Sequence, residues 1–147
     1  MVEKMRLLFR PIKLTCEFIV PDIEKSDGVQ KVIGFSRGWH HWNSIRLGYN
    51  RSENTNFVRL FLYAYVKGKR NEQLITTVKV GTKVDVELSF KHHVFAAIIR
   101  GKFGQYSKVE YAPIYFPIGY QLFPYAEIDG TEIRSKFNPD IRDVVVR

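Results

Sequence analysis

Apolar and polar residues alternate along most of this chain, which is the pattern of β-strands with one buried face. The clearest case is the stretch 83–90, in which the apolar set Val84, Val86, Leu88 and Phe90 alternates with Lys83, Asp85, Glu87 and Ser89. Successive side chains of a strand point to opposite faces, so this stretch predicts a strand half buried against a core. Similar alternation occurs at residues 13–20, 29–35, 42–50, 57–66, 74–80, 94–101, 109–116, 120–125 and 141–147. The sequence therefore predicts about ten strands.

Turn-forming residues separate these stretches. They occur at Ser26-Asp27-Gly28, Lys67-Gly68-Lys69, Gly81-Thr82 and Asp129-Gly130. No segment carries an apolar stripe of helical period over three turns, so we expect less than about 10% helix. Antiparallel strands must bury their apolar faces against another layer. We therefore predict an all-β fold of two packed antiparallel sheets, with a closed barrel as the alternative.

Length and composition predict one domain. The chain has 147 residues, of which 45% are hydrophobic, and this is enough apolar surface for one core. Neither a repeat of fixed period nor a linker interrupts it, so we expect residues 1–147 to form a single β-sandwich domain. The lone Cys16 alternates with Leu14 and Phe18, which predicts a small core residue and excludes an internal disulfide.

The charge balance favours anionic partners. Twenty-three Lys and Arg against fifteen Asp and Glu give a net charge of +8, which attracts nucleic acid and anionic glycans over a salt-dependent range. The alternative reading is that the excess only maintains solubility. No apolar run is long enough to span a membrane, and the N-terminal residues lack the pattern of a signal peptide. We therefore expect no membrane insertion and a cytoplasmic or virion location.

The densest group of polar and aromatic residues lies at 37–49. In a strand that begins near Trp42, the side chains of Trp42, Ser44 and Arg46 share one face. The opposite face holds Asn43 together with the apolar residues Ile45, Leu47 and Tyr49. The apolar set predicts that this second face belongs to the core.

Aromatic rings, amides and a guanidinium are the groups that bind sugars, anionic or neutral. We predict a ligand site formed by Trp39, His40, Trp42, Asn43, Ser44, Arg46 and Tyr63. Trp39 follows a glycine in an expected loop, so of these aromatic residues it is the least suited to the core. The alternative is a buried polar network, built on Asn43, Ser44 and Arg46, that orders the sheet.

The sequence offers no recognisable enzyme motif. Ser44 with a nearby histidine lacks the G-x-S-x-G elbow of hydrolases, and neither a Walker sequence nor G-x-G-x-x-G occurs. The pairs His40-His41 and His92-His93 lack partner ligands, and consecutive strand residues point to opposite faces unless a loop brings them together. We therefore predict no catalytic residue, no metal and no cofactor.

Four strings occur in an order that resembles a known family. They are Ile33-Gly34-Phe35-Ser36, His40-His41-x-Asn43-Ser44-x-Arg46-x-Gly48-Tyr49, Tyr63-Ala64-Tyr65-x-x-Gly68-x-Arg70 and Leu122-Phe123-Pro124-Tyr125. Together they resemble uncharacterised bacterial and phage concanavalin-like proteins over roughly residues 14–147. The resemblance implies a jelly-roll sandwich but brings no reaction or ligand. The sequence departs from the family at Ala126-Glu127-Ile128 and at Asn138-Pro139-Asp140, where the family has a glycine turn and a histidine.

Three functions are consistent with these features. The first is a non-enzymatic ligand-binding or adhesion module, with a glycan as the favoured ligand, displayed on a virion or a surface. The second is a structural virion protein whose basic faces meet other virion or surface proteins or nucleic acid. The third is an enzyme similar to the jelly-roll polysaccharide lyases, although their Gln-x-His and Tyr-x-Lys-x-Gly-x-Tyr strings do not occur here.

Overall fold

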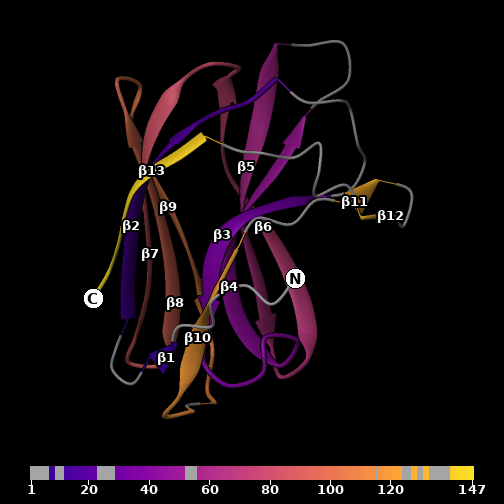
Figure 1. Cartoon of the computed structure of the whole chain (residues 1–147), viewed down its shortest axis with the longest axis vertical. Helices are drawn as coiled ribbons and strands as arrows, with labels where there is room; N and C mark the ends of the chain where they lie inside the picture. Colours follow the sequence, from indigo (N-terminus) through magenta and orange to yellow (C-terminus); the bar gives the residue numbers. More distant parts are fainter. Residues whose placement is uncertain are drawn as a thin grey trace.

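Two antiparallel sheets packed face to face form the protein in a computed structural model (Figure 1). The structure describes residues 7–8, 12–22, 29–51, 56–114, 116–123, 127–128, 131–132 and 140–147. Within these ranges the chain forms strands and loops without a helix, as the alternation predicted. Accordingly, no helix in the described ranges is long and apolar enough to cross a membrane.

The larger sheet, here called sheet A, contains six strands. In spatial order these are β1 (Leu7–Leu8), β10 (Gly119–Leu122), β3 (Gln30–Ser36), β4 (Asn43–Arg51), β5 (Phe57–Val66) and β6 (Lys69–Lys79). Sheet B contains five strands, in the order β13 (Asp140–Val146), β2 (Ile12–Ile19), β7 (Lys83–Lys91), β8 (Val94–Gly101) and β9 (Gly104–Tyr111). A separate short hairpin pairs β11 (Glu127–Ile128) with β12 (Thr131–Glu132).

The core lies between the two sheets because both present alternating apolar residues inward. Leu47 on β4 and Leu88 on β7 are fully buried. Aromatic rings join the layers: Phe18 and Tyr49 have centroids 6.3 Å apart, and Phe35 and Phe95 6.2 Å. Edge-on ring contacts of this kind add to the stabilisation from apolar burial.

Cys16 lies in this core, as its alternation with apolar residues predicted. Burial, together with the charge of Asp85, raises the pKa of its thiol to about 12. The residue therefore stays protonated near neutral pH and is a packing residue.

Two strands differ from the sequence-based expectation by more than one residue at a boundary that the structure describes. The strand expected at 74–80 begins at Lys69, directly after a tight turn in which Lys67 and Gly68 have φ of 53° and 77°. The strand expected at 109–116 spans 104–111 instead, because a turn at 102–103 begins the hairpin early. The expected turns at 26–28 and 129–130 and the end of the strand expected at 120–125 lie outside the described residues.

Candidate functional site

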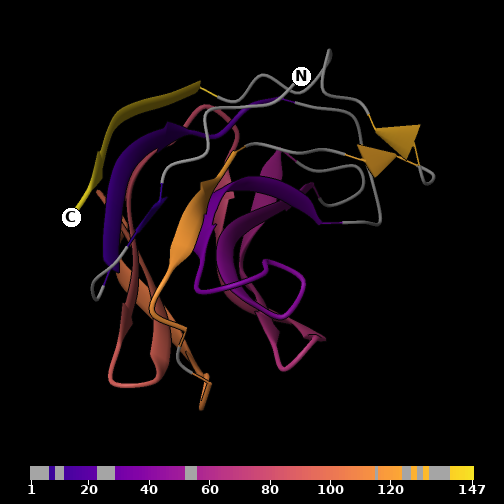
Figure 2. The ribbon, with the colours of Figure 1, turned by 60° about the horizontal axis from the view of Figure 1, so that its bottom comes forward.

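The candidate site lies on the face of sheet A that points away from sheet B, here called the outer face. Ile45, Leu47 and Tyr49 on β4 are fully buried toward the core, so the alternating residues Ser44 and Arg46 belong to the outer face. Figure 2 shows β3 and β4 curving around this outer face. The strand register places Ser44 opposite Tyr65, and Arg46 opposite Tyr63.

The loop between β3 and β4, residues 37–42, lies at one end of this face. Its turn is closed by the carbonyl of Trp39, which accepts the backbone N–H groups of Trp42 at 2.9 Å and Asn43 at 3.0 Å. Gly38 has φ of +86°, and a Cβ at this position would lie 2.7 Å from the Phe116 ring. Only a glycine fits this entry to the loop without strain, and the loop therefore holds Trp39 outward with 63% of its surface exposed.

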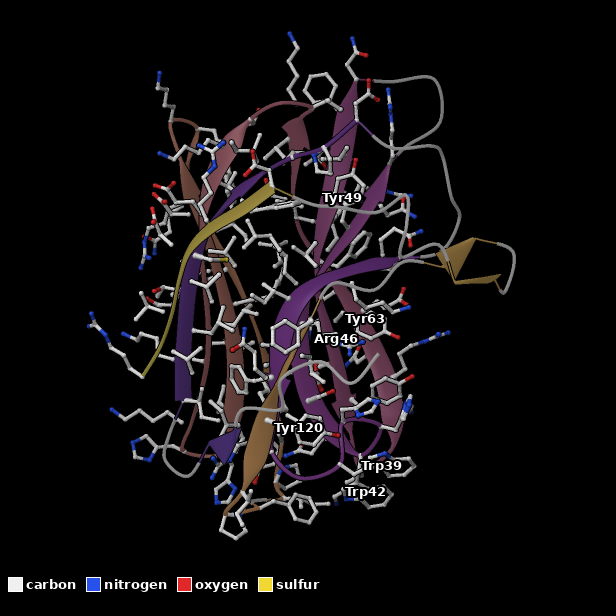
Figure 3. The ribbon with its side chains drawn as sticks, viewed as in Figure 1. Trp39, Trp42, Arg46, Tyr49, Tyr63 and Tyr120 are labelled. Atoms are coloured by element: carbon white, nitrogen blue, oxygen red, sulfur yellow. The ribbon has the colours of Figure 1, made fainter. Side chains whose placement is uncertain are left out.

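A connected series of rings runs from the loop onto the sheet. Ring centroids of Trp39 and His41 lie 5.2 Å apart, those of His41 and Tyr65 5.5 Å, and those of Tyr65 and Tyr63 5.9 Å. Figure 3 shows Trp39 and Trp42 at the loop end, with Arg46 and Tyr63 farther along the sheet. The rings of Trp39, His41 and Tyr65 therefore form an extended surface, and the Tyr63 ring continues the series beside Arg46.

His40 forms a compact unit with Tyr120 of β10. The backbone N–H of His40 donates to the Tyr120 hydroxyl oxygen at 3.0 Å, and the same hydroxyl lies 2.6 Å from His40 Nδ1. The hydroxyl proton is thus available to donate to an unprotonated Nδ1. Burial, followed by the charges of His41 and Arg46, lowers the pKa of His40 to about 4. His40 is therefore neutral near pH 7 and ties the loop to the sheet.

Tyr63 lies beneath the surface of the site. It is only 3% exposed, so its ring supports neighbouring side chains and cannot stack on a ligand without their displacement. Burial raises its pKa to about 12, the hydrogen bond and charge of Tyr65 act in the same direction, and Arg70 opposes them. Tyr63, which the sequence analysis predicted as part of the ligand site, is thus a residue that the fold covers.

The structure brings some of the predicted site residues together and separates others. Trp39, His40 and Arg46 border the outer face, and Trp42, 39% exposed, packs against Gly68. Asn43 is fully buried on the core side, where its Nδ2 donates to the Ile114 carbonyl at 3.2 Å.

Ser44, 2% exposed, donates to the His40 carbonyl at 2.7 Å. Ser44 therefore ties the loop to β4, whereas Asn43 ties β4 to the segment that follows β9. Arg37, which the sequence placed in the same polar group, is fully buried with its guanidinium over the Phe90 ring.

Sequence reasoning did not assign His41, Tyr65, Tyr120 and Arg70 to the site. Tyr65 shares the alternation of Tyr63 and could have been included on that signal. Tyr120 comes from a strand distant in sequence, and only the pairing of β10 with β3 brings it beside His40.

The rings of His40 and His41 lie 4.2 Å apart, because both residues belong to the loop and not to a strand. Among the described residues, no group of three or more His, Cys, Asp or Glu side chains is placed to hold a metal ion.

The pKa of His40 gives a testable prediction. Its imidazole should titrate near pH 4 by NMR, well below the usual value of about 6.5. Between pH 4 and about 6.5, His40 binds a proton in the unfolded chain but not in the folded one. Protonation therefore favours the unfolded chain, so the free energy of unfolding is highest above about pH 6.5 and falls as the pH drops toward 4. Tyr120→Phe removes the hydroxyl but keeps the ring and serves as the control for the hydrogen bond. A His40 that titrates at its usual value in the native protein would contradict this geometry.

The fold and site define an all-β sandwich with aromatic and basic side chains on the outer face of one sheet. A comparison with protein-family models finds no match, and a comparison with curated proteins also finds none. Among solved structures, the alginate lyase from Klebsiella pneumoniae superposes with a TM-score of 0.68 at 9% identity, over 93% of this chain and 59% of the lyase chain.

A second similar structure is the enzymatically active domain of tailspike protein 2 from bacteriophage CBA120. It superposes with a TM-score of 0.57 at 11% identity, over 92% of this chain and 22% of the tailspike chain. At these identities the likeness establishes a shared sandwich fold. This chain spans less than two thirds of either protein.

Proposed function

We propose that this protein is a glycan-binding module that holds sugar rings on the outer face of sheet A. The observation that carries the proposal is the series of rings Trp39, His41 and Tyr65 beside the guanidinium of Arg46. Sugar C–H faces stack on aromatic rings, and a planar guanidinium donates paired hydrogen bonds to sugar oxygens. Both kinds of group are present on one face here.

Two further points support this proposal. Trp39 is held exposed by a braced loop, although burial of an indole would stabilise the fold, which is typical of a residue kept for binding. The sandwich is shared with an alginate lyase and a phage tailspike domain, which supports a glycan as the ligand class. We extend the proposal to a jelly-roll, concanavalin-like sandwich that acts as an adhesion or recognition module of a larger assembly such as a virion.

Replacement of Trp39 by alanine tests the proposed site. On an array of polysaccharides, Trp39→Ala should lose about tenfold or more in affinity while its stability stays within about 0.5 kcal/mol of the original protein, because the side chain is exposed. Arg46→Lys, which keeps the charge but removes the planar donors, should also weaken binding.

The matched control is Tyr111→Ala, which removes an equally exposed aromatic ring, 64% exposed, from β9 of sheet B. This control should bind as the original protein does. Equal loss in Trp39→Ala and Tyr111→Ala, or no binding of any glycan by the original protein, would reject the proposal.

A second candidate function is a polysaccharide lyase, favoured by the His40–Tyr120 unit beside Arg46. β-Elimination requires a base for the proton next to a sugar carboxylate and a cation that stabilises the resulting negative charge. A phenol paired with a neutral imidazole, near a guanidinium, supplies such groups. Incubation with uronate polymers should then produce an unsaturated sugar that absorbs ultraviolet light, and Tyr120→Phe should abolish it. Binding without this product leaves the module function in place and rejects the enzyme.

A further inference from the structure

Positive charge is concentrated on the outer face of sheet A. Basic side chains extend from four neighbouring strands there: Lys31, Arg46, Arg59 and Arg70. Among the described residues of this face the acidic one is Glu72, which pairs with Arg70 at 3.6 Å. The described residues of the outer face therefore include more basic than acidic side chains.

Sheet B differs, because its strands carry six basic and six acidic residues, so their formal charges cancel. Lys83 pairs with Glu17 at 2.9 Å, and Glu87 lies 3.8 Å from Lys13 and 3.7 Å from Arg100. The surplus charge of the chain is thus not spread evenly over the two sheets. This surplus of basic residues lies on the same face as the exposed rings, and it is a separate observation from the rings.

Gly48 of β4 explains how the cations converge. Lys31 on β3 lies opposite Gly48, which in turn lies opposite Phe61 on β5. Because Gly48 has no side chain, Lys31 reaches across β4, and its Nζ lies 5.2 Å from the centroid of the Tyr63 ring. A Cβ at Gly48 would lie 2.5 Å from Val29 Cγ1 and 3.4 Å from the Tyr63 Cβ, so a side chain at this position would crowd the space between Lys31 and Tyr63.

Arg70 approaches the same tyrosine from the other side of β5. It shares a hydrogen bond with Tyr63, and this bond raises the pKa of Arg70. Arg46 lies directly opposite Tyr63 on β4. Three cations from β3, β4 and β6 therefore surround one buried ring, next to the accessible rings of Tyr65 and His41.

We propose that the glycan bound at this site is acidic, with its carboxylate or sulfate groups held by Lys31, Arg46 and Arg70 while its sugar rings lie on the Trp39, His41 and Tyr65 rings. This inference rests on the proposed glycan-binding function and specifies its ligand class. Anionic groups gain charge-assisted hydrogen bonds from these side chains, whereas a neutral sugar gains only the ring contacts and ordinary hydrogen bonds.

Matched pairs of polymers test the ligand class. Polygalacturonate is compared with the same polymer after chemical reduction of its carboxyl groups, and dextran sulfate with dextran. Binding is measured by calorimetry at about 0.15 M salt, where long-range attraction is screened beyond about 8 Å. We expect binding to at least one charged polymer and a loss of about tenfold or more for its neutral counterpart. The two pairs distinguish carboxylate from sulfate.

Variants that each remove one positive charge test which residues hold the charged polymer. Lys31→Gln and Arg70→Gln should each weaken binding of the charged polymer by about tenfold, and should weaken binding of the neutral one much less. Lys102→Gln, which removes an exposed charge from the β8–β9 turn of sheet B, is the control for net charge and should change affinity by less than about twofold. Equal binding of charged and neutral polymers overturns the acidic specificity but keeps the glycan function. Equal losses in Lys102→Gln and Arg70→Gln overturn the assigned site, and no binding of any polymer rejects the proposed function itself.

Discussion

Replacing Phe95 with alanine should lower the free energy of unfolding by about 3–5 kcal/mol, because it removes a buried ring and leaves a cavity between the sheets. Phe95 is fully buried on β8 and contacts Phe35 of sheet A across the interior, with ring centroids 6.2 Å apart. It also packs against Phe90 at 5.0 Å. Urea denaturation followed by tryptophan fluorescence measures the change.

The control lies on the same strand. Ile98 alternates with the core residues of β8, so it faces outward and is only half buried. Ile98→Ala should therefore cost about 1 kcal/mol. A loss in Phe95→Ala no larger than that in Ile98→Ala would mean that Phe95 does not join the two sheets, and the packing of sheet A on sheet B would have to be revised.

The sandwich could be predicted from the sequence because strand alternation is a local signal. Residues 57–66 and 94–101 form strands with the expected bounds, since β-branched and aromatic residues alternate up to a turn at each end. The first part of β6 was missed because its residues 69–73 are polar on both faces at the edge of sheet A. That part of the strand forms because its backbone pairs with β5. The pattern of apolar and polar side chains contains no information on this pairing.

The candidate site could be predicted only in part, for a related reason. Alternation along β4 separates Arg46 from Ile45 and Leu47, and the structure follows this division. It gives no information on residues that arrive from other strands, so Tyr120 and Arg70 were missed. Alternation also does not show how deeply a side chain on a given face is buried. Tyr63 and Tyr65 share one face, yet Tyr63 is buried and Tyr65 is partly exposed.

The glycine of β3 opposite Arg46 offers a direct test of how the strands position the site. Gly34→Ala should destabilise the protein by about 3 kcal/mol or more, since the new Cβ would lie 2.0 Å from the Ile45 carbonyl oxygen and 2.7 Å from the Arg46 Cα. Both contacts are with backbone atoms of β4, so no side-chain rotation relieves them. Strands β3 and β4 must separate locally, which displaces Arg46 from the ring series. Thermal unfolding measures the stability, and polysaccharide affinity at a temperature where the variant stays folded measures the displacement.

Gly81→Ala is the control for Gly34→Ala. It shows how much stability is lost when a glycine is replaced without a clash between strands. Gly81 has φ of +86°, but a Cβ there would meet nothing within 4 Å, so its replacement adds backbone strain of about 1 kcal/mol and no clash. Because Gly81 lies away from β3 and β4, Gly81→Ala should retain full glycan affinity. Gly34→Ala should exceed it in destabilisation and should also lose affinity while still folded. If the two variants are equally stable, or if folded Gly34→Ala binds as tightly as the original protein, the β3–β4 contact does not position Arg46 for binding.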